Sequence, residues 1–186
     1  MDAVGYDLYC KMLNEAIKSL KGDEEEEEFF ETTVDMEMDA FIPSTYIMNE
    51  IQKLDVYKRI AAIETEDELM DMQEELVDRY GDLPNAVNNL LNIALIKAYC
   101  HSVYVQGLVQ KGNEVKLMMY PKAKLDVSKI PELIKKYGNS LKFYAQGSPY
   151  FTYQLPKPAK GKTDNNWIFE NIKKLLDDFK SLLPQS

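Results

Sequence analysis

The chain has 186 residues, 45% of them hydrophobic, which is enough for one domain with a real core and one appended element. No apolar run reaches the length of a membrane span and no signal-peptide pattern is present, so we expect a cytoplasmic, monomeric protein without a membrane segment. The net charge of -9 is uneven, because residues 1–100 hold 24 acids and 8 bases whereas residues 101–186 hold 7 acids and 14 bases.

The N-terminal residues differ in composition from the rest of the chain. Apolar spacing predicts a helix over residues 4–21, and its abrupt start suggests a fragment of a longer protein. The acidic run Asp23–Glu28 follows, and like charges at this density repel one another. We therefore predict a helical extension over 1–22, an acidic linker over 23–32 and the domain proper over 33–186.

The next segment predicts one strand and one helix. Polar and apolar residues alternate over residues 33–42, which is typical of a half-buried strand, and Pro43 ends it. Asn49 has the side chain of a helix cap, so a helix is expected to run from there to about Ala62. The positions expected to face inward on this helix are Ile51, Leu54, Tyr57 and Ala61.

Residues 65–101 predict two helices joined by a tight corner. Thr65 and Glu68 have capping-box spacing, and Gly81 suits the end of the first helix. Asp82 is expected to cap the second helix, with Pro84 in its first turn. The apolar stripe of the first helix consists of Leu69, Met72, Leu76 and Tyr80.

The second of these helices, Leu83–Cys100, is apolar nearly all round, a pattern typical of an element at the centre of its domain. We expect it to form the core. The residues predicted to lie deepest are Leu90, Leu91, Ala94 and Leu95.

After His101 the hydrophobic period changes to two. The predicted strands are 103–109 and 114–120, joined by a hairpin at Lys111-Gly112-Asn113, and then 141–145 and 150–155. A short helix capped by Ser128 and a closing helix over 167–183 complete the pattern. Strands and helices do not alternate strictly, so we predict an α+β fold: a helical N-terminal half with a central apolar helix, packed with a mixed or antiparallel sheet and a closing C-terminal helix.

Residues 161–163 read Gly-Lys-Thr, the end of a phosphate-binding loop, between a predicted strand and a predicted helix. The full motif requires a glycine at position 156, which is Pro156, a residue without the amide that would help to cradle a phosphate. A nucleotide-binding enzyme at Gly161–Thr163 is therefore an alternative that the sequence disfavours.

No catalytic or metal-binding set can be assembled from the sequence. His101 is the single histidine, and Cys100 beside it leaves a metal site short of the three or four ligands that it requires. His101 is interpreted as structural. Cys10 and Cys100 are interpreted as buried free thiols. From the lack of a catalytic or metal-binding set we expect no cofactor or metal and no catalysis in this chain.

The helix over residues 65–80 carries a second, polar side. Glu74, Glu75, Asp78 and Arg79 lie within about one turn, opposite the apolar stripe. Two acids and an arginine in a fixed array can pair with a basic or mixed patch on another domain, although a solvated face is the alternative reading. A second possible surface is the Lys-rich half, which would make the chain a nucleic-acid-binding module.

The string DELMDMQEELVDRYGDLPNAVNNLL at residues 67–91 resembles the C-terminal domain of the bacterial transcription-repair coupling factor family. The resemblance extends to AVGYDLYCKMLNEAI, to DMEMDAFIPSTYI and to LDVYKRIAAIETEDEL, and after about Gly107 it is one of pattern. The acidic run and TYIMNEI depart from the family pattern.

The resemblance implies a parent protein that binds stalled RNA polymerase, translocates on DNA by ATP hydrolysis with magnesium, and recruits UvrA to nucleotide excision repair. Residues 1–22 would then lead out of the translocase module. The C-terminal domain would be non-catalytic and autoinhibitory, docking on a UvrB-like N-terminal module and masking its UvrA-binding surface. By resemblance, the docking residues include Glu74, Glu75, Asp78 and Arg79.

Overall fold

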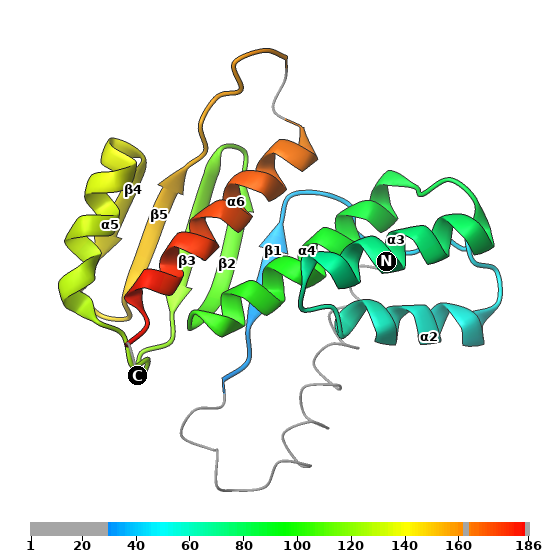
Figure 1. The fold of residues 1–186 in the computed structure, drawn as a ribbon, viewed down its shortest axis with the longest axis horizontal. Coiled ribbons are helices and arrows are strands. Elements are labelled where there is room, and N and C mark those ends of the chain that lie inside the picture. The colour runs from blue at the N-terminus through cyan, green and yellow to red at the C-terminus, as the bar shows by residue number, and fades with distance from the viewer. Residues whose placement is uncertain (1–29, 162–163, 185–186) are drawn as a thin grey trace, which may run out of the picture. The chain divides into compact units, whose positions relative to one another are not determined.

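The structure is a computed structural model that describes residues 30–161 and 164–184 (Figure 1). The predicted N-terminal helix, the acidic run and Cys10 lie outside the described residues, as do Lys162 and Thr163. The described chain forms two compact units, a helical unit over residues 38–98 and a sheet unit over residues 30–37 and 99–184.

The helical unit contains α2 (Glu50–Ala61), α3 (Glu66–Tyr80) and all but the last turn of α4 (Asn85–Ser102). The Asn49 side chain caps α2 by accepting a hydrogen bond from the Gln52 N–H, as predicted. The chain before α2 is tied down by the Phe41 N–H, which donates to the Ala86 carbonyl at 3.2 Å. Ile42 donates its N–H to the Tyr57 hydroxyl at 2.9 Å, which fixes this segment on one side of α2.

The hydrogen bond between Ile42 and Tyr57 lies on the side of α2 that faces inward. The residues predicted to face inward on this helix are wrong in part. Ile51 is 80% exposed and Leu54 is 53% exposed, whereas Tyr57 is buried as expected and Ala61 is half-buried. The helix carries two apolar stripes, and the loop before it packs on the other one. The buried residues of α2 are Lys53, Val56, Tyr57 and Ile60.

Helix α4 has the burial that its composition predicts. Leu90, Leu91 and Leu95 have no exposed surface and Ala94 is 4% exposed. The helix starts two residues later than predicted, because Pro84 lies just before it and accepts hydrogen bonds from the N–H groups of Val87 and Asn88. Asp82 is therefore not its cap.

The sheet unit has five strands in the order β1-β2-β3-β5-β4 (Figure 1). Strand β1 pairs with β2 in parallel and the other pairs are antiparallel, which confirms the mixed α+β fold. The hairpin turn lies at Gly112-Asn113, with Gly112 at a φ of 57°. The strands are β1 (Thr33–Met36), β2 (Val105–Lys111), β3 (Glu114–Met119), β4 (Leu141–Tyr144) and β5 (Tyr150–Gln154).

Strand β1 is shorter than the alternation over residues 33–42 predicts. The Glu37 N–H still donates to the Gln110 carbonyl at 3.2 Å, but the chain then bends and leaves the sheet for the helical unit. Phe30 and Thr32, which fall at the end of the predicted linker, are buried in the sheet unit. Phe30 stacks on His101 and on Tyr120, so the folded domain begins by residue 30.

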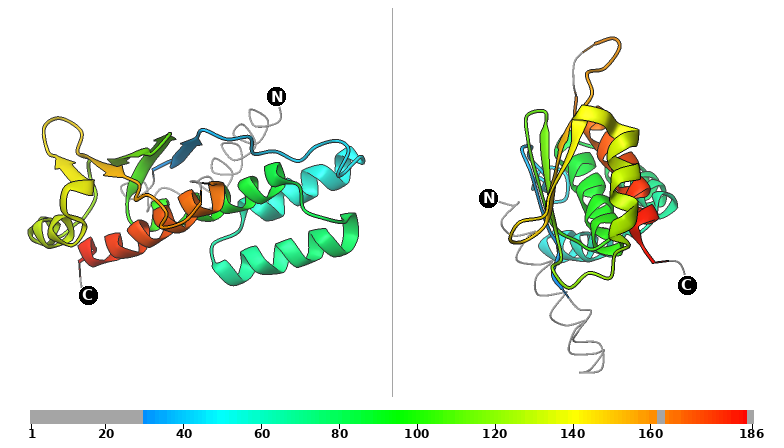
Figure 2. Two further views of the ribbon diagram at one scale, coloured as in Figure 1. Left: turned by 90° about the horizontal axis from the view of Figure 1, so that it is seen from above. Right: turned by 90° about the vertical axis from the view of Figure 1, so that its left-hand side faces the viewer.

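Two helices, α5 (Ile130–Tyr137) and α6 (Asn165–Phe179), cover one side of the sheet (Figure 2). Phe179 of α6 lies 4.8 Å from Phe151 of β5, measured between ring centroids. A 3-10 turn over Val127–Lys129 precedes α5, and its cap is Asp126 rather than the predicted Ser128. The closing helix α6 has the predicted apolar face, with Ile168, Ile172, Leu175, Leu176 and Phe179 all buried.

Candidate functional site

The frame of the predicted docking surface is α3, whose two ends are fixed by local hydrogen bonds. The Thr65 hydroxyl accepts from the Glu68 N–H at 3.1 Å, and the Glu68 carboxylate accepts from the Glu64 N–H at 3.0 Å. At the other end, Gly81 has a φ of 91° and donates its N–H to the Val77 carbonyl. These caps satisfy backbone groups that a helix end leaves open, so α3 is a well-defined platform for its surface residues.

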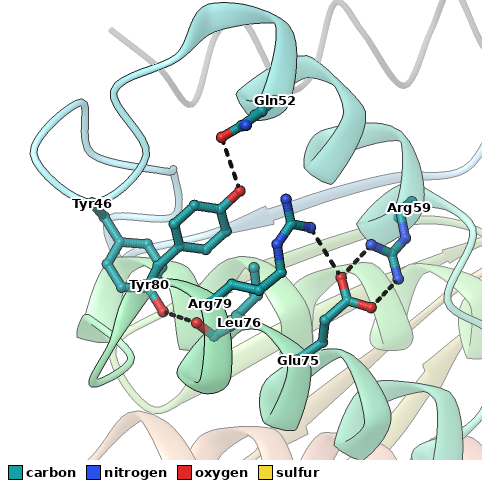
Figure 3. Close-up of polar contacts among 7 residues, drawn as sticks. All are labelled: Tyr46, Gln52, Arg59, Glu75, Leu76, Arg79 and Tyr80. Carbon is teal, nitrogen blue, oxygen red and sulfur yellow. Dashed lines mark hydrogen bonds and ion pairs between the residues drawn. The ribbon is translucent and has the colours of Figure 1, made fainter.

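Glu75 lies at the centre of a charged network on this helix (Figure 3). Arg59 of α2 binds both of its carboxylate oxygens, with 2.7 Å from Nη2 to Oε1. Arg79, one turn further along α3, lies 3.4 Å from Oε2. The hydrogen bond from Arg59 is the main cause of a lowered pKa for Glu75 and a raised pKa for Arg59. Glu75 is therefore held as an anion by two guanidinium groups.

A second cluster fixes the C-terminal end of α3 (Figure 3). The Tyr46 hydroxyl lies 3.1 Å from the Leu76 carbonyl and 2.9 Å from the Gly81 carbonyl, so it donates to the backbone at the C-terminal end of the helix. Burial, and then the nearby Asp82 charge, raise the pKa of Tyr46. Tyr80 donates its hydroxyl to the Gln52 side chain at 3.3 Å, and this contact links α3 to α2.

The four residues predicted for docking fall into two groups. Glu75 and Arg79 belong to the network described above, and Glu75 is only half-exposed. Glu74 and Asp78 are exposed and make no hydrogen bond or ion pair with any residue that the structure describes. Of the four residues predicted for docking, these two unpaired acids are thus the ones left available to a partner.

Two exposed apolar side chains, which were not among the predicted docking residues, accompany these two acids. Met70 is 58% exposed and Val77 is 41% exposed. Residues 70, 74, 77 and 78 are spaced as neighbours on one side of a helix, so Met70, Glu74, Val77 and Asp78 share one exposed part of α3. We call these four residues the α3 face.

Arg59 is the other residue that sequence reasoning missed. It lies 16 positions before Glu75 and on a different helix, so no local spacing connects the two. The amino-acid composition held the one available hint of this contact. Arg59 and Arg79 are the two arginines of the chain, and both contact the Glu75 carboxylate.

The residues that were considered for metal or phosphate binding, His101, Cys100 and Pro156, lie in structural surroundings. His101 Nδ1 lies 3.2 Å from the Thr32 hydroxyl, and burial raises the pKa of the Cys100 thiol. The Pro156 carbonyl accepts a hydrogen bond from the Trp167 ring N–H at 2.8 Å. Within residues 30–161 and 164–184, no three His, Cys, Asp or Glu side chains are grouped to hold a metal ion, and no helix there has the length and hydropathy needed to cross a membrane.

Comparison with known proteins points to one family. A family model described as the TRCF domain matches residues 36–130. The transcription-repair-coupling factor of Bacillus subtilis is 34% identical over 188 residues, which cover 100% of this chain and 16% of that protein. The corresponding protein of Staphylococcus aureus (strain USA300) is 34% identical over 171 residues, covering 90% of this chain and 14% of its own length.

A solved structure gives the same answer for the fold. The crystal structure of a C-terminal domain of transcription-repair coupling factor matches with a TM-score of 0.64 and 26% identity, and covers 81% of this chain and 94% of its own. The class defined here is thus an α+β domain with a capped, charged helix at its surface. The chain belongs to the TRCF domain family of the transcription-repair coupling factors. It spans about a sixth of the length of the Bacillus subtilis relative.

Proposed function

We propose that this chain is a non-catalytic regulatory domain of a transcription-repair coupling factor. The α3 face docks on the UvrB-like N-terminal module of the same protein and masks the surface that binds UvrA. The observation that carries the proposal is the pair Glu74 and Asp78, two exposed acids without a described partner on a helix that is capped at both ends. Family membership supplies the context in which such a surface meets other modules.

The chemistry of the α3 face favours a partner with basic and apolar groups. Glu74 and Asp78 offer two carboxylates, and Met70 and Val77 offer apolar surface beside them. Charge complementarity sets the orientation and the association rate of such a contact. The apolar residues add surface that is removed from water when the two modules dock. Glu75 is bound by Arg59 and Arg79, and this contact places Arg79 beside the face.

The mechanism is a shift between two populations. In the closed form the α3 face covers its partner module, and in the open form UvrA can bind there. Engagement of the parent with stalled RNA polymerase and DNA releases the closed form. ATP and magnesium belong to the translocase module of the parent, and this chain uses neither.

The proposal is tested in the full-length parent by the double variant Glu74→Lys/Asp78→Lys. Loss of a desolvated charge contact costs on the order of 2–5 kcal/mol, enough to move a closed–open balance substantially. UvrA binding without DNA or polymerase, measured by calorimetry or by surface plasmon resonance, should rise at least tenfold. The reversal of Glu74 and Asp78 avoids Glu75, whose substitution would also break the contact with Arg59.

A matched control is Glu132→Lys/Glu170→Lys, which makes the same charge change at two exposed positions on α5 and α6. This control should leave UvrA binding unchanged. Equal UvrA binding by the wild type and by the α3 variant, with both proteins folded, would mean that the α3 face is only a solvated surface.

A further inference from the structure

The sheet has a second side, opposite α5 and α6, that carries its own set of side chains. Phe151 points toward α6, and side chains alternate along a strand, so Tyr150 and Thr152 of β5 point to the opposite side. The register places Lys116 of β3 and Lys142 of β4 opposite Thr152, on that same side. Four residues of this side carry the inference, and we call them the sheet face: Lys116, Lys142, Tyr144 and Tyr150.

Three of these residues form a column that runs across the strands. The Lys116 ammonium lies 4.5 Å from the centre of the Tyr150 ring. The Tyr144 ring stacks on Tyr150 with 4.7 Å between centroids and an interplanar angle of 13°. Because β5 lies between β3 and β4, Lys116 and Tyr144 occupy opposite faces of the Tyr150 ring.

Tyr144 is the end of that column. Strand β4 is the edge of the sheet, and Tyr144 is 41% exposed, so its side chain has accessible surface for a further planar group. Lys142 lies two residues before Tyr144 on the same side of β4 and is exposed. On this side of the sheet, Glu114 pairs with Gln154, at the end of β5 away from Tyr150.

We infer that the sheet face binds single-stranded DNA, with a base stacked on Tyr144 and phosphates beside Lys142 and Lys116. Aromatic side chains on which bases stack, flanked by cations that follow the backbone, are how proteins bind single strands with little dependence on sequence. Duplex DNA does not fit this arrangement, because its bases are already stacked on one another. The inference is independent of the proposed docking, since it concerns another unit of the chain and other residues.

The test uses the full 186-residue chain and a fluorescein-labelled dT12 oligonucleotide, with binding followed by fluorescence anisotropy at 50 and 150 mM NaCl. Tyr144→Ala should weaken binding by about 5- to 150-fold, the range found for loss of one stacked base. Tyr144→Phe keeps the ring and should bind within twofold of the wild type. Lys142→Ala should lower the slope of log K against log salt by about 0.7, which corresponds to one lost phosphate contact on a single strand.

The matched control is Lys135→Ala, which removes an exposed lysine from α5 on the other side of the sheet. It should leave both the affinity and the salt slope unchanged. Photocrosslinking to 5-bromodeoxyuridine locates the contact, and the expected adducts fall within residues 142–150. If Tyr144→Ala does not fold, the Lys142→Ala salt slope and the adducts decide the matter.

Four results would overturn the inference. The wild type could fail to bind dT12 at 50 mM salt, or could bind a 12-base-pair duplex as tightly as it binds dT12. Lys135→Ala could weaken binding as much as Lys142→Ala does, which would indicate charge attraction without a defined site. Tighter binding of rU12 than of dT12 would assign the face to RNA.

Discussion

Arg59 in the last turn of α2 binds both carboxylate oxygens of Glu75 in α3, so one arginine joins two helices of the helical unit. Glu75 also lies within ion-pair distance of Arg79. The carboxylate at the middle of the acidic helix is thus committed to contacts within the domain. Of the four residues predicted for docking, its neighbours Glu74 and Asp78 are the ones that remain for a partner.

The first prediction concerns Glu75→Gln. The Glu75 and Arg59 side chains are 34% and 41% exposed, so solvent screens the pair, and its loss should lower the free energy of unfolding by about 1 kcal/mol or less at pH 7. The folded-state pKa of Glu75 lies below its ordinary value of 4.5. The contribution is therefore fully present above pH 4.5 and is lost as the pH falls through the lowered pKa.

Urea unfolding of Glu75→Gln and of the wild type at several pH values checks this prediction. The difference between the two proteins should close below pH 4.5. Glu74→Gln is the control, because Glu74 has no described partner and its removal should change stability by no more than about 0.5 kcal/mol at any pH. A difference for Glu75→Gln that persists unchanged at low pH would show that the ion pair contributes nothing.

The second prediction concerns the core of the helical unit. Leu91 has no exposed surface, so Leu91→Ala removes buried methyl groups and leaves a cavity. The free energy of unfolding should fall by about 2–5 kcal/mol in chemical denaturation. Met70→Ala, at a position that is 58% exposed, should cost less than about 0.5 kcal/mol in the same experiment.

The third prediction concerns the contact between α5 and α6. Asp178 is 18% exposed, and burial alone would raise its pKa, but hydrogen bonds from Lys136 and Tyr137 lower it. Tyr137→Phe removes one donor from a mostly buried carboxylate and should cost about 1.5–3 kcal/mol, the range for hydrogen bonds to charged groups. Thermal unfolding measures the loss, and Tyr144→Phe is the matched control, because the structure shows no hydrogen bond from its hydroxyl to any residue it describes.

The fourth prediction concerns nucleotide chemistry. Pro156 stands where a phosphate-binding loop has its first glycine, and its carbonyl accepts from the Trp167 ring. The purified chain should neither hydrolyse ATP nor gain melting temperature when ATP and magnesium are added. A coupled ATPase assay and differential scanning fluorimetry check this, and ATP turnover that disappears in Lys162→Ala would contradict it.

Local signals in the sequence determined where most of the elements lie. The Thr65 cap, the glycine at position 81, the Gly112-Asn113 turn and the apolar stripe of α6 each concern residues a few positions apart, and the structure has all of them where they were predicted. The acids of α3 could be assigned to one polar side for the same reason. Interactions within one or two helical turns depend little on the rest of the fold.

Contacts between distant residues were decided by the tertiary structure. The sequence offered two apolar stripes on α2, and the structure, in which the Ile42 N–H donates to the Tyr57 hydroxyl, buries the one that excludes Ile51. It gave no sign that Arg59 would bind Glu75, or that Tyr144 and Tyr150 would stack across two strands. Each of these contacts depends on which elements pack together and in which register, and that is set by burial summed over the whole domain rather than by the preferences of any one segment.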